Sequence, residues 1–356
     1  MNDPDNASSY DTIDTARMRE RLSAMSDQCE EAYAAGQHLP LPDDYRSVRQ
    51  VVIAGMGGSG LGAEIVQSWC TLTSTQRVTT WRGYGLPPFA TGPQTLIIAI
   101  SKSGQTEETL SAFVEATRRG CALMAITTGG VLARLAQERG IPLLTFTFPY
   151  QAREAIGWLT FPLLAILGRM GYLPDSTSDV EETVKLLRET TVRINVDVPA
   201  VHNPVKRMAG QVMDRLPIIY GAGVLAPVAR RWKMTLNETA KLLAIYDELP
   251  ELNHSSVAGY LQPEAIWQKA IVIQLRSTLD TPRIAQRFDL TTRLMLECGI
   301  NQDTVRARGT SALAQVFSLV QYGDWMSYYA AVMSGVDPTP TEPITWLKQE
   351  LEETNH

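Results

Sequence analysis

The sequence predicts an α/β protein with parallel β-sheets that are covered by helices on both faces. From residue 48 onward, short apolar runs rich in Val and Ile alternate with longer helical stretches, a pattern typical of βαβ units. A second region, 218–223, is another apolar run that ends in a glycine turn, 166 residues after the turn at Gly55 and Gly57. We therefore expect one α/β domain and a degenerate internal duplicate of it.

The elements follow in order along the chain. Residues 1–14 are expected to be flexible, and a helix is expected over 15–36, where Gly36 provides a C-terminal signal. The expected strands are 51–54, 95–100, 122–127, 142–148, 218–223 and 270–275, and the expected helices are 60–70, 107–119, 131–139 and 228–244. The predicted domain ranges are 1–45 (flexible segment and helix), 46–175 (first domain), 176–204 (helical connection) and 205–356 (second domain).

Composition excludes several classes of partner. The 356 residues are 44% hydrophobic and carry a formal net charge of −6, which argues against a nucleic acid or an anionic membrane as partner. No apolar run approaches the roughly 20 residues needed to cross a bilayer, and the polar first ten residues do not resemble an export signal. Four scattered cysteines without a CxxC pair fit a reducing compartment. We expect a cytoplasmic protein.

Two loops carry the clearest chemical signal. Gly55-Met56-Gly57-Gly58-Ser59-Gly60 follows the run 51–54, and Ser101-Lys102-Ser103-Gly104-Gln105-Thr106 follows the run 95–100. Strand-to-helix turns that offer hydroxyl groups and glycine amides bind anions, most plausibly phosphate. In the duplicate, Val224-Leu225 replaces Gly58-Ser59, so only the first half is expected to hold phosphate.

Other interpretations of the first loop are weaker. Gly55, Gly57 and Gly60 satisfy GxGxxG, but a dinucleotide site needs an acidic residue about twenty positions further on. The sequence has no Asp or Glu between Glu64 and Glu107. A Walker loop is excluded because no GK[ST] follows. Tight turns without a ligand remain possible for a single loop and are less favoured for two.

The segments Gly-Met-Gly-Gly-Ser-Gly and Ser-x-Ser-Gly-x-Thr-x-Glu-Thr resemble the two signature loops of the sugar isomerase (SIS) domain. The resemblance implies two flavodoxin-like SIS domains, each an αβα sandwich with a parallel sheet. It also implies binding of a phosphosugar. The residues that it assigns to the phosphate are Gly58, Ser59, Ser101, Ser103 and Thr106.

Two further segments resemble a particular branch of this superfamily. Asn237-Glu238-Thr239-Ala240-Lys241 and Pro250-Glu251-Leu252-Asn253-His254 are similar to the NE-x-A-K and PE-x-NH motifs of the bifunctional phosphoglucose/phosphomannose isomerases. The resemblance extends over nearly the whole chain, including the tail from Gly335 to Lys348. It implies a metal-independent enzyme without a cofactor that converts glucose 6-phosphate and mannose 6-phosphate to fructose 6-phosphate.

The resemblance assigns a role to each catalytic candidate. Glu238 matches the base that moves a proton between C1 and C2 through a cis-enediol(ate), work that suits a carboxylate. His254 matches the group that shuttles a proton at the ring oxygen. Arg153 matches the arginine beside the enediolate oxygens, and Lys348 matches a lysine associated with ring opening. Thr341 occupies the position that can accommodate the C2 epimer.

Departures and alternatives complete the sequence-based expectations. Lys102, Gln105, Ala152 and Ser255-Ser256 differ from the common family pattern without removing a group that the mechanism needs. The resemblance also implies a homodimer with the active site near the subunit interface, in which His254 can serve the neighbouring subunit. The main alternative is a non-catalytic SIS module that senses a phosphosugar. Glucosamine 6-phosphate synthase chemistry and a dehydrogenase are less favoured.

Overall fold

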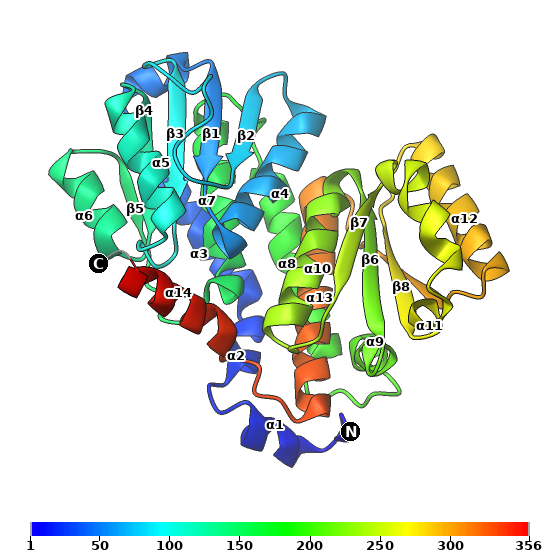
Figure 1. Ribbon diagram of the computed structural model, residues 1–356. Helices are drawn as coiled ribbons and strands as arrows, with labels where there is room; N and C mark the ends of the chain where they lie inside the picture. Colours follow the sequence, from blue (N-terminus) through cyan, green and yellow to red (C-terminus); the bar gives the residue numbers. More distant parts are fainter. Residues whose placement is uncertain (1, 355–356) are drawn as a thin grey trace. The chain divides into compact units, whose positions relative to one another are not determined.

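A computed structural model describes residues 2–354, and the chain forms two compact units. The first unit comprises residues 24–188 and 309–317, and the second comprises the other described residues. Each unit is built on one parallel β-sheet with helices packed against it (Figure 1). The α/β class with two parallel sheets is therefore confirmed, whereas the domain ranges expected from the sequence stay predictions.

The first unit contains a five-stranded sheet in the order β2-β1-β3-β4-β5. This is the strand order of flavodoxin-like folds. The strands are β1 (Gln50–Ala54), β2 (Arg77–Trp81), β3 (Thr95–Ile100), β4 (Ala122–Thr127) and β5 (Leu143–Thr145). The helices are α3 (Met25–His38), η1 (Asp43–Ser47), α4 (Gly57–Thr73), α5 (Glu107–Arg118), α6 (Gly130–Glu138), η2 (Ala152–Glu154), α7 (Ile156–Arg169) and most of α8 (Thr177–Ile194).

The second unit contains a four-stranded sheet in the order β7-β6-β8-β9. The strands are β6 (Leu216–Ala222), β7 (Ile245–Leu249), β8 (Ala270–Arg276) and β9 (Gln302–Arg306). The helices are α1 (Ala7–Ile13), α2 (Met18–Ser23), α9 (Pro204–Val212), η3 (Gly223–Leu225), α10 (Ala226–Glu238), η4 (Glu251–His254), η5 (Ser256–Leu261), α11 (Glu264–Trp267), α12 (Pro282–Glu297), α14 (Glu342–Thr354) and most of α13 (Ala312–Ser334).

Burial on both faces explains the apolar runs of the first sheet. Val52 and Ile97 pack with Phe113 of α5 in a core cluster that also includes residues of α6. The residues that alternate with them, such as Ile53 and Ile98, are also fully buried, and α4 packs against β1, β2 and α7. Strands that are covered on both sides have no need of polar positions, so they appear in the sequence as continuous apolar runs.

The backbone confirms the internal duplication. Gly57 after β1 has a φ of +49°, and Gly223 after β6 has a φ of +52°. Both values lie in the left-handed region, where a side chain would be strained. Each of these strands lies second in its sheet and is followed by a helix that leads to the edge strand, β2 or β7. The two sheets therefore repeat one chain path, with one strand fewer in the second.

Three of the four edge strands, β2, β7 and β9, were not expected from the sequence. β2, β7 and β9 are half-exposed strands with polar residues, and β5 is shorter than the expected run. An edge strand pairs on one side only and needs no continuous apolar run. The helix expected over 15–36 is also divided, into α2 and α3.

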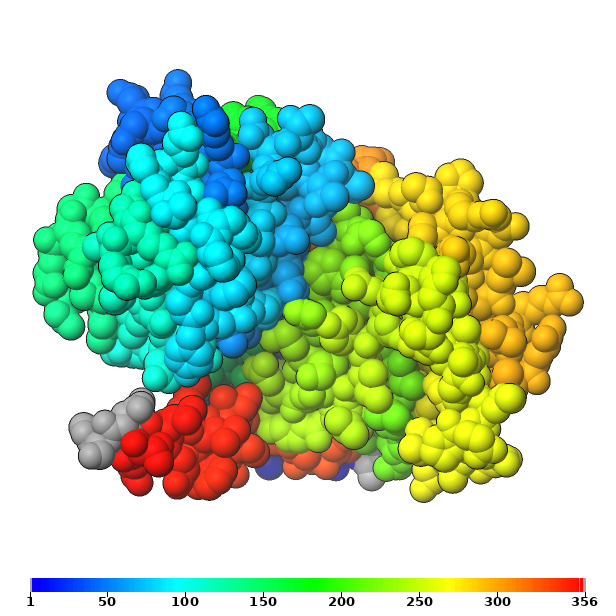
Figure 2. All heavy atoms as spheres, turned by 45° about the horizontal axis from the view of Figure 1, so that its top comes forward, coloured from blue at the N-terminus to red at the C-terminus, as the bar shows by residue number. Residues whose placement is uncertain are grey.

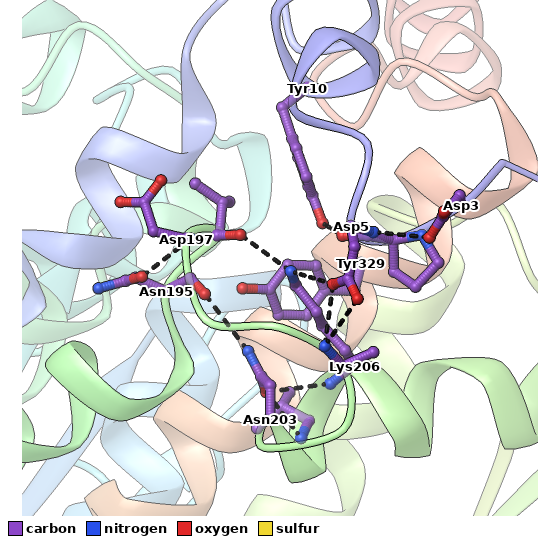
Figure 3. Close-up of polar contacts among 12 residues, drawn as sticks. Asp3, Asp5, Tyr10, Asn195, Asp197, Asn203, Lys206 and Tyr329 are labelled. Atoms are coloured by element: carbon purple, nitrogen blue, oxygen red, sulfur yellow. Dashed lines mark hydrogen bonds and ion pairs between the residues drawn. The ribbon is translucent and has the colours of Figure 1, made fainter.

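The expectation that residues 1–14 are flexible is wrong for the described part of this segment. Residues 7–13 form α1, and Tyr10 is only 1% exposed. The ammonium group of Lys206, itself buried, lies 3.0 Å from the carboxylate of Asp5 and 2.9 Å from the carbonyl of Val196 (Figure 3). A buried lysine needs a counter-charge, and the N-terminal segment provides it. None of the described helices has the length and apolarity needed to cross a bilayer.

We expect the Glu182 carboxylate to stabilise the start of α13. It accepts hydrogen bonds from Thr310 N at 2.6 Å, from Thr310 Oγ1 at 2.7 Å and from Ser311 N at 2.9 Å. Burial opposes the charged form, but the hydrogen bonds from Ser311 and Thr310 outweigh it and lower the pKa of Glu182 to about 2. Glu182→Gln should therefore lower the free energy of unfolding by about 1–2 kcal/mol at pH 7.

The pH dependence tests the cause. Because the folded-state pKa is lowered, the stabilisation is present above the unfolded value of about 4.3 and is lost as the pH falls from there towards 2. Urea unfolding of both proteins from pH 7 to pH 3 should show the difference shrinking at the acid end. Glu181→Gln, at an exposed neighbouring position, is the control. An equal loss in both variants would contradict the capping role.

Candidate active site

The first sheet reverses its strand order between β1 and β3. β1 continues into α4 and β3 into α5, which lead to strands on opposite sides of this pair. In parallel α/β sheets, ligands bind where the strand order reverses in this way. Both loops singled out in the sequence leave the sheet at this point.

The loop after β3 is organised around Ser101. This residue is 1% exposed, and its hydroxyl lies 2.8 Å from that of Thr106 and 3.5 Å from that of Ser103. The amide of Gly104 donates to Ser101 Oγ at 3.0 Å. Three of the predicted phosphate ligands are thus together within one loop, and Thr106 is also the N-cap residue of α5.

The loop after β1 brings the remaining predicted ligands to the helix start. Gly58 and Ser59 are buried and lie in the first turn of α4. The first amides of a helix have no acceptor within the helix and lie at its positive end. A β-carbon on Gly58 would lie only 3.0 Å from the carbonyl oxygen of Ala152. This loop therefore lies directly against the turn that carries Arg153.

Arg153 lies in η2 and is 6% exposed. The neighbouring Glu154 is close enough to Lys102 for its charge to act on the lysine: burial lowers the pKa of Lys102, and Glu154 opposes that shift. The structure therefore brings the turn of Arg153 to both phosphate-loop candidates within the first unit. The role of each residue stays a prediction.

A third loop supports this arrangement and was missed in the sequence. Thr128 donates to the carbonyl of Lys102 from its amide at 3.1 Å and from its hydroxyl at 2.7 Å. Gly104 has a φ of +66°, and a β-carbon there would lie 1.8 Å from the carbonyl of Gly129. The signal was available: the apolar run 122–127 is followed by Thr128-Gly129-Gly130, another small hydroxyl-bearing turn.

The end of β2 does not resemble a dinucleotide site. A dinucleotide fold carries its ribose-binding carboxylate there. Here the residue after β2 is Arg82, which forms an ion pair with Glu64 of α4 at 3.0 Å.

In the second unit, Glu238 is half-buried and is the last residue of α10. The helix stops there, so the helix expected over 228–244 is too long. Lys241 takes a φ of +55° and donates to the carbonyl of Glu238 at 2.7 Å, and Asn237 Oδ1 accepts from the amide of Ala244 at 3.0 Å. The residues of the motif around Glu238 thus fix the end of its helix.

A buried ion pair holds α10 against α13. Arg231 Nε lies 2.9 Å from Asp324 Oδ1, and Arg231 Nη2 lies 2.6 Å from Asp324 Oδ2. A stacked pair of aromatic rings lies beside it, in which Trp232 and Tyr322 are 5.5 Å apart and 4° from parallel. Glu238 therefore stands at the end of a firmly packed helix.

His254 is exposed and lies in η4, after the carboxyl end of β7. Its neighbours are fixed. Asn253 donates to Thr291 Oγ1 at 2.8 Å and accepts from Arg287 Nη1 at 3.2 Å, while Ser256 donates to the carboxylate of Asp247. The loop is anchored on both sides of an imidazole that is open to solvent.

The second sheet separates Glu238 from His254. α10 returns from the carboxyl end of β6 to the amino end of β7, and β7 then runs back to the carboxyl end, where His254 follows. Five strand residues span about 16 Å. Within this unit, the two residues lie at opposite ends of the sheet.

Thr341 and Lys348 belong to the C-terminal segment. Thr341 precedes α14, and its carbonyl accepts from the amides of Ile344 and Thr345. Lys348 lies on α14, whose described side chains are exposed (red in Figure 2). Lys241 Nζ also reaches the carbonyl of Pro338 at 3.5 Å, so the segment before Thr341 is linked to the end of α10. Among the described residues, no group of three or more His, Cys, Asp or Glu side chains could hold a metal ion.

In the second unit, the loop after β8 corresponds to the loop after β3 in the first unit, which is a phosphate-loop candidate. Asp280, whose side chain is 6% exposed, accepts from the amide of Ser277 at 3.1 Å and lies 3.9 Å from Arg276 Nε. Burial raises the pKa of Asp280. Thr281 is the N-cap residue of α12, as Thr106 is the N-cap residue of α5. The duplicate loop therefore contains its own carboxylate.

Comparison with known proteins gives a family match for the C-terminal part of the chain. Residues 201–351 match the family model described as "Bacterial phospho-glucose isomerase C-terminal SIS domain". A protein of known structure, a hypothetical protein from Thermus thermophilus, shares the fold with a TM-score of 0.73 and 15% identity, over 95% of this chain and 90% of that one.

Curated relatives match over most of the chain. The bifunctional phosphoglucose/phosphomannose isomerase of Caldicellulosiruptor bescii is 34% identical over 337 residues, which cover 94% of this chain and 99% of the relative. That of Aquifex aeolicus is 31% identical, over 86% of this chain and 92% of the relative. With the duplicated SIS fold and its loops, these matches show that the chain belongs to the bifunctional phosphoglucose/phosphomannose isomerase family.

Proposed function

We propose that this protein is an aldose–ketose isomerase that interconverts glucose 6-phosphate and mannose 6-phosphate with fructose 6-phosphate, without a metal ion or cofactor. The observation that carries the proposal is the group of hydroxyls around Ser101 at the carboxyl edge of the first sheet. It is supported by the alignment with a relative named for this activity, which covers nearly the full length of both chains. We also propose a cytoplasmic location, which the four free cysteines fit.

The substrate phosphate would bind between the loops that follow β1 and β3. Ser101, Ser103 and Thr106 would donate their hydroxyls, and Gly58 and Ser59 would offer the amides at the start of α4. The two helix N-termini favour an anion. Lys102, half-buried beside the loop, adds a positive charge that a bound phosphate would stabilise.

The chemistry is a proton transfer between adjacent carbons. After ring opening, in which His254 would exchange a proton at the ring oxygen, the Glu238 carboxylate would remove the proton from C2 of the aldose. The resulting cis-enediolate would be stabilised by Arg153, and Glu238 would return the proton to C1. Lys348 would assist ring opening.

One site can serve both substrates. Glucose 6-phosphate and mannose 6-phosphate differ only at C2, and loss of the C2 proton gives both the same enediol. A single base then suffices if C2–C3 rotation is allowed, and Thr341 would accommodate the two positions of the C2 hydroxyl.

The proposed enzyme is a homodimer with its active site near the subunit interface. Glu238 and His254 lie at opposite ends of the second sheet, and His254 is exposed on an anchored loop. An arrangement in which His254 serves the neighbouring subunit would bring the two groups to one substrate.

Glu238→Gln should lower kcat for both aldose phosphates at least about 1,000-fold, because an amide cannot accept the C2 proton. The measurement is fructose 6-phosphate formation from each substrate separately, with a chelator present. Glu248→Gln, at an exposed position on β7, is the control. Wild-type turnover by Glu238→Gln would remove the proposed base, and activity lost on adding the chelator would exclude the metal-free reaction. Binding without any turnover by the wild type would favour a sensor.

Ser101→Ala should raise KM for the sugar phosphate about 10- to 100-fold. This factor corresponds to the free energy of one hydrogen bond to a charged group. KM and competitive inhibition by inorganic phosphate should change together, because both report the same cradle. Ser68→Ala, whose hydroxyl bonds only within α4, provides the comparison. An unchanged inhibition constant in Ser101→Ala would place the phosphate elsewhere.

Mixing two inactive variants tests the shared site. If Glu238 and His254 act across the interface, a heterodimer of Glu238→Gln and His254→Ala subunits retains one intact site. Equal mixing after dissociation should restore about a quarter of wild-type activity. No recovery, in a mixture shown to contain heterodimers, would mean that both residues act within one subunit.

A further inference from the structure

The side chain of Gln28 joins α3 to the turn that carries Arg153. Gln28 is 8% exposed. Its amide nitrogen donates to the carbonyl of Glu154 at 2.9 Å, and its amide oxygen accepts from the backbone amide of Gly157 at 2.6 Å. We propose that Gln28 is a positioning residue for Arg153. This inference rests on the proposed function.

The two bonds hold the turn at its exit. Glu154 directly follows Arg153, so a fixed Glu154 carbonyl fixes the peptide unit next to the arginine. Gly157 lies in the first turn of α7, where backbone amides have no acceptor within the helix. One buried side chain thus bonds to both a carbonyl and an amide of this backbone segment.

The other side of the turn is fixed by different contacts. The amide of Gln151 donates to Glu154 Oε1 at 3.2 Å, as part of a capping box around η2. The carbonyl of Ala152 faces Gly58 of the phosphate-loop candidate, where a β-carbon would make a tight contact of 3.0 Å. The place of Arg153 relative to the phosphate therefore depends on a three-residue turn, and the two hydrogen bonds of Gln28 join this turn and the start of α7 to α3.

Position matters because an arginine stabilises an enediolate only where the negative charge develops. Displacement of a catalytic group by about 1 Å can cost about 100-fold in rate. The hydrogen bonds that the described residues make with Gln28 involve Glu154 and Gly157 and not the hydroxyls of Ser101, Ser103 and Thr106, so we expect phosphate binding not to depend on Gln28. Loss of the two Gln28 hydrogen bonds should therefore lower kcat and leave the affinity for phosphate unchanged.

The experiment compares Gln28→Met with Gln37→Met, a control at a half-buried position on the same helix. Methionine has nearly the shape of glutamine and neither its donor nor its acceptor. We expect kcat for the hexose phosphates to fall at least about 10-fold in Gln28→Met. The inhibition constant of inorganic phosphate should stay within about two-fold, and Gln37→Met should match the wild type.

A double-mutant cycle separates positioning from a general structural effect. If Gln28 acts through Arg153, then Gln28→Met should cost no further activity in an Arg153→Ala background. Independent, multiplicative losses would overturn the inference, as would a Gln28→Met protein with wild-type kcat. If Gln28→Met does not fold, Gln28→Glu keeps the acceptor for Gly157 and loses the donor, and the same tests apply. A wild type without isomerase activity would instead reject the proposed function.

Discussion

Parallel strands force the loops that leave one edge of a sheet to diverge wherever successive connections cross to opposite sides. In the first unit this happens between β1 and β3, which continue into α4 and α5. The buried hydroxyl of Ser101, the Gly58 amide and the turn of Arg153 all depend on this one point. The loop after β4 supports it from the side through Thr128. The chemistry proposed for the protein follows from where the chain reverses its strand order.

Elements that depend on local sequence could be predicted, and those that depend on distant partners could not. β1 and β3 are buried on both faces, so their residues form readable apolar runs. β7 pairs on one side only and contains Asp247 and Glu248, so it forms no continuous apolar run that would identify it as a strand in the sequence. The hydroxyl cluster of the second loop could be recognised in the sequence because its members lie within six consecutive residues, 101–106. The proposed positioning of Arg153 depends on hydrogen bonds from Gln28 on α3, and no local sequence pattern connects Gln28 with Arg153.

The catalytic candidates of the second unit show the same division. The motif around Glu238 marks it as a candidate base, which stays a prediction, while the structure explains its setting: Asn237 and Lys241 end α10, and Arg231 paired with Asp324 packs the helix. Removing one partner of such a buried pair typically costs about 3–5 kcal/mol, because the other charge is left without compensation. The separation of Glu238 from His254 by the length of β7 required the strand order, which no single motif contains.

The carboxylate of Asp280 gives the duplication a chemical meaning. The loop after β8 descends from the same plan as the loop after β3, yet its negative charge is covalently part of the chain. The Asp280 carboxylate accepts a hydrogen bond from a backbone amide of its own loop. When charged, it also repels a second anion. The duplicate loop thus contains a carboxylate of the chain itself, whereas the first copy, under the proposed function, would take its anion from each substrate and give it up with each product.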